Sequence, residues 1–198
     1  MILVDSGSTA TAEDGTEAAP YKTLEAAFAA AAEGDTVKLL AGYTLTQSIA
    51  VDKTVVFEMN GKTVVFRPAE TTGTASAFVI QEGGKLTVHY GAILGSSGCD
   101  SRAFEGQSGS VLTLDTVTAA EFNAAGNGGV VSMVGGTLTI KESSLGYYDY
   151  TAKMGYGNAA YNGGAVYLSN SEAGITDCRI FYNKSTDPTL SLIHISEP

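Results

Sequence analysis

The chain of 198 residues has no tryptophan and little positive charge. It carries 11 Lys and Arg residues against 21 Asp and Glu residues, so its formal net charge is −10 at pH 7. A nucleic-acid partner requires a basic face that neutralises phosphates, and we therefore expect none. No run of 18 apolar residues occurs, so no membrane-spanning helix is predicted. The first residues also lack the basic start and long apolar stretch of a secretion signal.

Cysteine and proline are scarce, with two and four residues respectively. Cys99 and Cys178 lie about three sequence repeats apart, and stacked strands rise by about 4.8 Å each, which places the two residues on the order of 14 Å apart. A disulfide needs Cα atoms within about 7 Å of each other. We therefore expect two free, partly buried thiols.

One six-residue pattern occurs three times, at Gly83–Val88, Gly109–Leu114 and Gly135–Ile140, with an interval of 26 residues. Each copy opens with two small residues and continues with apolar residues that alternate with polar ones. A period of two predicts a short strand with one buried face. One such strand in each interval of this length predicts a solenoid, with two apolar columns stacked inside it. These columns are Leu86, Leu112 and Leu138, and Val88, Leu114 and Ile140.

A helix is expected near the N-terminus, over residues 20–34. Pro20 and Thr23 indicate its start and Gly34 its end, and the alanines and glutamates between them favour helix. Four apolar residues share one face of this helix: Leu24, Ala27, Phe28 and Ala31. Because a solenoid needs its open end covered, we interpret the helix as the N-terminal cap.

Three strands are predicted after this helix, over residues 35–40, 49–57 and 63–67. The last two are separated by a turn at Asn60-Gly61, a sequence that favours reversal of the chain.

Segment 2–45 resembles the first coil of pectate-lyase-like right-handed parallel β-helix proteins. The resemblance rests on the order of Tyr21–Leu24, an alanine-rich helix, Gly34–Val37 and Ala41–Tyr43. It implies an all-β fold, namely a single-stranded right-handed parallel β-helix (a solenoid) with a short N-terminal capping α-helix. We expect one such domain over residues 1–189.

Two further segments carry resemblances. Asn162–Leu168 with Ile180–Asn183 resembles the repeats of polymorphic outer-membrane and autotransporter-type adhesins, although the second element is one residue shorter here and the resemblance covers two coils. It implies a secreted or cell-surface protein. Residues 190–198 resemble the translation of an adapter used in sequencing libraries, so we expect a non-biological tail on a truncated metagenomic chain that naturally continues with more coils.

The repeat lengthens once, because Asn127–Val131 recurs as Asn162–Val166 at an offset of 35. About nine extra residues fall within segment 147–161, and insertions into a solenoid are extruded as loops. Six of the ten tyrosines lie between positions 147 and 167. Such a loop could stack on sugar rings or contact a protein, or it could pack on itself and cover the coil wall. The candidate ligand-binding residues are Tyr147, Tyr148, Tyr150, Lys153, Tyr156, Asn158 and Tyr161.

No catalytic residue, metal site or cofactor is predicted. Glycoside hydrolysis needs two carboxyl groups roughly 5–10 Å apart, and on the outward columns Glu142 and Asp177 form the single adjacent acidic pair. We interpret this pair as solvated, with a Ca²⁺ site as the alternative, although Ca²⁺ takes six to eight oxygen ligands. His89 is expected on the surface without a Ser or Asp partner. Arg102 and Arg179 are isolated in the sequence pattern and are expected as salt-bridged surface residues.

The sequence therefore favours a non-catalytic secreted or cell-surface module, similar to an adhesin, whose partner is a glycan or a host or cell-surface protein. The alternative is a fragment of a polysaccharide lyase or glycoside hydrolase whose catalytic coils are missing.

Overall fold

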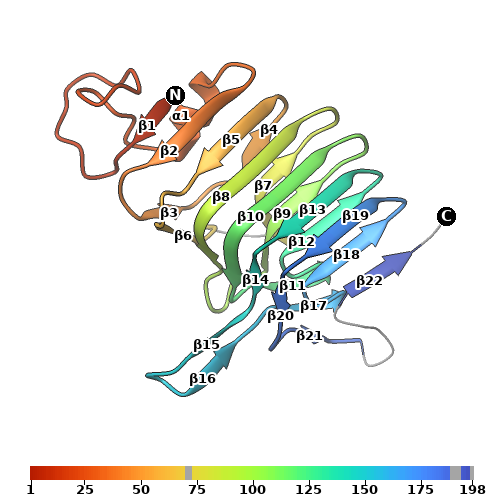
Figure 1. The fold of residues 1–198 in the computed structure, drawn as a ribbon. Helices are drawn as coiled ribbons and strands as arrows, with labels where there is room; N and C mark the ends of the chain where they lie inside the picture. Colours follow the sequence, from red (N-terminus) through yellow and green to blue (C-terminus); the bar gives the residue numbers. More distant parts are fainter. Residues whose placement is uncertain (70–72, 188–192, 197–198) are drawn as a thin grey trace.

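The computed structural model describes residues 1–69, 73–187 and 193–196. The fold is all-β with one short helix, and its strands form successive rungs stacked along one direction, with α1 near the N-terminal end (Figure 1). Two parallel sheets curl around a shared apolar core and give the chain a solenoid-like architecture. The predicted all-β class and parallel stacking are confirmed.

The larger sheet has 11 strands and contains the three copies of the repeated pattern. Its strands are β1 (Ile2–Val4), β2 (Asp35–Leu39), β3 (Tyr43–Leu45), β5 (Thr54–Glu58), β6 (Thr63–Phe66), β8 (Lys85–Leu94), β10 (Val111–Ala120), β13 (Thr137–Lys141), β14 (Ser144–Leu145), β19 (Glu172–Thr176) and β20 (Arg179–Ile180).

The second sheet has nine strands, and a separate two-stranded sheet forms a hairpin. The strands of the second sheet are β4 (Ile49–Val51), β7 (Ala75–Ile80), β9 (Ser101–Gly106), β11 (Asn123–Asn127), β12 (Val131–Val134), β17 (Ala159–Asn162), β18 (Val166–Ser169), β21 (Lys184–Ser185) and β22 (Ile193–Ser196). The hairpin consists of β15 (Tyr147–Asp149) and β16 (Met154–Tyr156).

The two predicted apolar columns are present in the larger sheet. Strand β8 pairs in parallel with β10, and β10 with β13, so that Leu86, Leu112 and Leu138 occupy the same position in three successive rungs. The second column aligns in the same register, and all six side chains are at most 1% exposed. Parallel pairing therefore places like side chains directly above one another in a dry interior.

Helix α1 (Leu24–Ala30) covers the N-terminal end of this interior. The Thr23 side chain accepts a hydrogen bond from the Ala26 N–H at 3.2 Å, which satisfies a free donor of the first turn. The Phe28 ring packs against Phe57 and Phe78 with centroid distances of 5.5 Å. The predicted cap is thus confirmed, but it is shorter than residues 20–34. The chain leaves the helix at Ala31, whose backbone is extended.

The predicted strand over residues 49–57 is wrong, because the chain turns a corner there. Strand β4 belongs to the nine-stranded sheet and β5 to the larger one, with Asp52 and Lys53 between them. Buried residues alternate with more exposed ones on both sides of this corner, so a period of two conceals it. The turn at Asn60-Gly61 is confirmed, since both residues have positive φ angles of 54° and 70°.

A stack of left-handed residues marks another corner of successive rungs. Tyr90, Thr116, Glu142 and Asp177 have φ angles between 46° and 58°. Tyr90 lies inside β8, and Thr116 lies inside β10. Each strand bends at this residue and continues in a new direction around the core. Non-glycine residues adopt this conformation rarely, so its recurrence in register reflects a constraint imposed by the coil.

Segment 147–161 contains the predicted extrusion. Strands β15 and β16 pair antiparallel, and the hairpin projects from the stack of rungs (Figure 1).

Cys99 and Cys178 are free and partly buried, as expected. In the described part of the chain, no helix has the length and apolar character needed to cross a membrane.

The C-terminal rung is less covered than the rungs before it. Ala173 occupies the position of Leu138 and Ile175 that of Ile140, but Ala173 is exposed and Ile175 is half-buried. Of segment 190–198, residues 193–196 are described, as strand β22 paired in parallel with β18. The remainder of that segment lies outside the described residues.

Candidate functional site

The hairpin is anchored to the wall of rungs through one of its two faces. The rings of Tyr147 and Tyr156 stack at a centroid distance of 4.9 Å and an interplanar angle of 17°. The Tyr147 hydroxyl donates a hydrogen bond to Glu121 Oε1 at 2.9 Å. Burial, this hydrogen bond and the negative charge of Glu121 raise the pKa of Tyr147 to about 12. Tyr147 therefore remains neutral and bonded to the wall at physiological pH.

The opposite face of the hairpin carries a second group of aromatic rings. The Tyr148 ring lies 4.9 Å from Tyr150 at 81°, and 6.0 Å from Tyr182 at 27°. Gly155 makes this contact possible, because a Cβ atom at that position would lie 2.5 Å from the Tyr182 ring. Tyr148, Tyr150, Phe181 and Tyr182 line a hollow of about 400 Å³, which we call the aromatic hollow.

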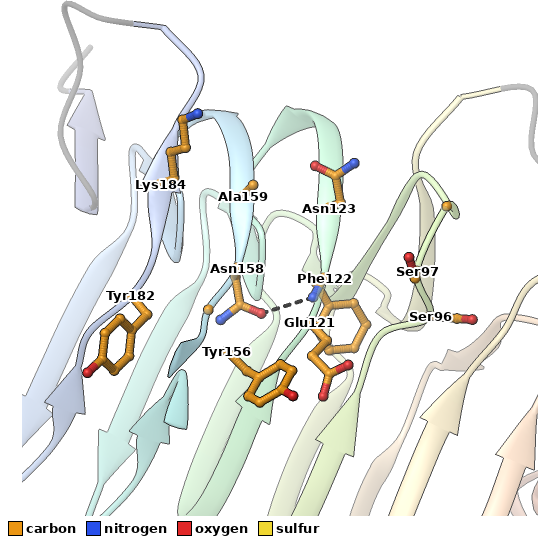
Figure 2. A pocket seen from close by; sticks show the side chains of 12 residues that line it. Ser96, Ser97, Glu121, Phe122, Asn123, Tyr156, Asn158, Ala159, Tyr182 and Lys184 are labelled. Carbon is orange, nitrogen blue, oxygen red and sulfur yellow. Dashed lines mark hydrogen bonds between the residues drawn. The ribbon is translucent and has the colours of Figure 1, made fainter. Parts of the chain in front are cut away.

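A larger cavity of about 520 Å³, here called the corner cleft, lies beside the anchored face of the hairpin. Its lining comes from four successive passes of the chain, at Ser96–Gly98, Glu121–Asn123, Tyr156–Ala159, and Tyr182 with Lys184. Figure 2 shows Tyr182 and Lys184 on one side of the cleft, and Ser96 and Ser97 on the other. The cleft thus combines aromatic rings with hydroxyl, carboxylate, amide and ammonium groups.

The wall of the corner cleft is held by two stacked asparagines. Asn158 is 2% exposed, and its amide nitrogen donates to Asn183 Oδ1 at 2.7 Å and to the Ala119 carbonyl at 3.1 Å. Its amide oxygen accepts from the Phe122 N–H at 3.1 Å (Figure 2). Asn183 in turn donates to the Leu145 carbonyl at 2.8 Å. These bonds join the rung that carries the hairpin to the rungs on either side.

The structure brings most of the predicted contact residues together on the hairpin. Tyr147, Tyr148, Tyr150 and Tyr156 all lie on or next to β15 and β16. Tyr150 is 85% exposed. These four tyrosines divide between the two faces of the hairpin.

The other three predicted residues have different surroundings. Lys153 is exposed in the turn of the hairpin. Asn158 borders the cleft, but its amide group is hydrogen bonded within the wall. Tyr161 lies exposed on β17 and lines neither the corner cleft nor the aromatic hollow.

Sequence reasoning missed Glu121 and Tyr182, which contact or border the hairpin. Both were detectable, because Glu121 precedes Tyr147 by the 26-residue interval and Tyr182 follows it by the 35-residue interval. The three residues therefore hold equivalent positions in successive rungs, as the pairing of the neighbouring Ala119 with Leu145 and of Leu145 with Ile180 confirms. These equivalent positions hold a glutamate and two tyrosines, so a pattern of repeated apolar residues does not reveal them.

A charged ladder runs along the outer face of the larger sheet, formed by Glu58, His89, Asp115 and Lys141. Glu58 Oε2 lies 2.6 Å from His89 Nδ1, and Lys141 Nζ lies 3.0 Å from Asp115 Oδ2. His89 Nε2 lies 4.0 Å from the same Asp115 oxygen. The His89 side chain is 43% exposed, as a surface position predicts, but the prediction that it lacks an Asp partner is wrong, because parallel stacking places a carboxylate on each side of the ring.

Asp115, one of the two acids of this ladder, has a pKa below its ordinary value. Burial alone would raise the pKa of Asp115, but hydrogen bonds from Lys141 and Thr116, together with the Lys141 charge, outweigh that effect. A carboxyl group that serves as a general acid needs the opposite shift. The ladder thus has the electrostatics of a set of mutually paired surface charges.

Arg102 is also placed differently from the prediction of a surface residue. It is 9% exposed in β9, and its Nε has no hydrogen-bond partner in the described structure. Burial lowers the pKa of this guanidinium group, against the opposing charges of Glu105 and Asp100. Arg179 is exposed, and it lines a shallow groove with Glu142 and Asp177.

Among the described residues, no three His, Cys, Asp or Glu side chains are grouped so that they could hold a metal ion. Comparisons of the chain with protein-family models, curated proteins and solved structures found no match. The hairpin, the corner cleft and the charged ladder are therefore the features of the chain that bear on its function.

Proposed function

We propose that this chain is a right-handed parallel β-helix that acts as a non-catalytic, secreted or cell-surface binding module, similar to an adhesin. The hairpin and the corner cleft would contact a glycan or a protein on another cell. The pectate-lyase-like and adhesin-like sequence patterns support this proposal, as do the in-register parallel rungs and the stacked left-handed corner.

The observation that carries the proposal is the contrast between the buried, in-register rungs and the aromatic hairpin that projects from them. The rungs bury their apolar side chains, whereas the hairpin holds tyrosines at the surface beside a cleft lined by polar groups. Aromatic faces with adjacent hydroxyl, amide and charged groups are suited to sugar rings and to protein interfaces. Rigid support of the hairpin by Glu121 and the asparagine stack reduces the entropy lost on binding.

A binding screen tests this function. The protein would be applied to an array of glycans and to a panel of extracellular proteins, together with the variants Tyr156→Ala and Tyr182→Ala. We expect both variants to reduce the signal at least tenfold, because each removes an aromatic wall of the cleft. Tyr90→Ala is the matched control, since Tyr90 is 53% exposed but lines neither cavity. Equal signals from all four proteins would contradict the proposal.

The charged ladder is the observation that favours the second candidate, a fragment of a polysaccharide lyase or glycoside hydrolase. It places two carboxylates and a histidine on one outward column. Incubation with a panel of plant and bacterial polysaccharides, followed by measurement of reducing ends and unsaturated products, tests this alternative. We expect no turnover. Turnover that disappears in Glu58→Gln and Asp115→Asn would favour the enzyme.

A further inference from the structure

We infer that the aromatic hollow is a cage for a quaternary ammonium group, such as the trimethylammonium head of choline. The inference deepens the proposed function and rests on it, because it takes the hairpin to be a contact element and specifies the ligand for the face that packs against Tyr182. It assigns a ligand chemistry to rings that the rest of the fold does not require.

The geometry of the four rings is that of a box with one open side. The rings of Tyr148 and Tyr182 are stacked at a centroid distance of 6.0 Å and an angle of 27°, and we take these two rings as its floor. Tyr150 stands at 81° to Tyr148, and Phe181 stands at 75° to Tyr182, so the two outer rings form side walls. All four rings line the same hollow. A compact, nearly spherical group would therefore meet aromatic faces on several sides, whereas a flat sugar ring needs one broad face.

The aromatic lining of the hollow also favours a cation. The lining of the aromatic hollow consists of aromatic residues alone, and the chain has a net charge of −10. The faces of aromatic rings carry negative partial charge and attract ammonium groups within about 6 Å of the ring centre. A quaternary ammonium group is suited to such a box, because it has no N–H donors that would need hydrogen-bond acceptors.

The fold keeps the box open and its floor in place. Tyr150 is 85% exposed and Tyr182 is 54% exposed, so the rings are not covered by the protein itself. The floor depends on Gly155, because any side chain there would displace the Tyr182 ring from its place beside Tyr148. Tyr147, on the other face, fixes the hairpin to the wall through Glu121. The cage is thus assembled before a ligand arrives.

Calorimetric titration of the full chain with choline chloride tests the inference, with 3,3-dimethylbutan-1-ol as the comparison ligand. This alcohol has the shape of choline but a carbon atom in place of the charged nitrogen. We expect saturable binding of choline and at least tenfold weaker binding of the alcohol. Equal binding of the two compounds would show a merely apolar hollow and would overturn the inference, as would the absence of choline binding.

Variants of Tyr150 separate the ring from its hydroxyl group. We expect Tyr150→Leu to weaken choline binding about 3- to 30-fold, the range that cation–π contacts provide. Tyr150→Phe retains the aromatic face and should bind as the wild type does. Tyr90→Leu is the control at an exposed tyrosine outside the hollow. Wild-type affinity in Tyr150→Leu would overturn the inference.

The same variants distinguish failure of this inference from failure of the proposed function. Tyr150 lines the aromatic hollow but not the corner cleft, whereas Tyr156 lines the cleft but not the hollow. A screen signal that is lost in Tyr156→Ala, without any binding of choline, refutes the cage and leaves the proposed function intact. Choline binding in a protein that gives no screen signal retains the cage and refutes the broader proposal.

Discussion

The regular rungs and the hairpin bury their side chains to very different extents. Leu112 and Leu114 of β10 are fully buried and align with equivalent residues above and below. On the hairpin, Tyr150 and Met154 are 85% and 55% exposed, and the two strands pair only with each other. One region therefore provides the free energy of folding, while the other presents side chains to the solvent at a fixed place.

This division explains how a solenoid tolerates an insertion. The rung before the hairpin remains in register, since Thr118 pairs with Ser144 and Ala119 with Leu145. The register is restored after the hairpin, where Asn123 pairs with Ala159. An insertion at a corner lengthens the path without moving the strands that bury the core, and surface loops of this kind cost little free energy.

The largest expected effect is that of a cavity in the rungs. Leu112→Ala should lower the free energy of unfolding by about 2–5 kcal/mol, because the residue is fully buried between Leu86 and Leu138. Urea denaturation followed by circular dichroism measures this loss. Thr113→Ala, a neighbouring and partly exposed position, should change it by less than about 0.5 kcal/mol. Similar losses in both variants would mean that the apolar column does not carry the stability.

The next largest effect is expected at the stacked asparagines, which join the rung that carries the hairpin to its neighbours. Asn158→Ala should destabilise the fold by about 1–3 kcal/mol, because the Phe122 N–H loses its partner in a buried site and the Ala119 carbonyl keeps only the Gly146 N–H. Thermal and urea unfolding would measure it. Asn123→Ala serves as the control, since Asn123 is exposed. An unchanged midpoint for Asn158→Ala would imply that water replaces the amide.

Removal of the anchor of the hairpin should have a smaller effect. Tyr147→Phe deletes the hydrogen bond to Glu121 and should cost at most about 1 kcal/mol at pH 7. The sign of its pH dependence follows from the raised pKa. The folded state holds the Tyr147 proton more tightly than the unfolded state, so this contribution is complete below pH 10 and is lost as the pH rises towards 12.

Urea denaturation at pH 9 and pH 11.5 measures this dependence. The difference in stability between the two pH values should be smaller in Tyr147→Phe than in the wild type. It should not vanish, because burial and a hydrogen bond to Glu25 raise the pKa of Tyr43 as well. Tyr90→Phe is the control, and an identical decrease in both variants would contradict the assignment.

The smallest effect is expected on the outer face of the rungs. Asp115→Asn should lower the free energy of unfolding at pH 7 by less than about 1 kcal/mol, because the partly exposed pair with Lys141 is weak in water. Since the pKa of Asp115 is lowered, its contribution is present above its ordinary value of 3.8 and is lost as the pH falls below it. Unfolding at pH 7 and pH 3 measures this, with exposed Glu142→Gln as the control. A larger effect at pH 3 would contradict this sign.

Prediction from the sequence succeeded where a residue type repeats at a constant interval. The columns of Leu86 and Val88 were recognisable because parallel rungs of equal length align like residues. Prediction failed for the charged ladder, because Glu58 precedes His89 by 31 residues rather than 26, and because Asp115 follows His89 by 26 residues but is of a different residue type. It also failed for Arg102, whose burial depends on segments that cover it from elsewhere in the chain.

The sequence alone determined the all-β class, the parallel stacking, the helical cap and the position of the extrusion, because alternation and repeat length are local properties of the chain. Tertiary structure alone decided how the tyrosines divide between the two faces of the hairpin, and that Glu121 and Tyr182 join them. Contacts between rungs connect residues about 20 to 36 positions apart, and each contact depends on the registers of all the strands between. Those registers are fixed only when the whole coil closes around its core.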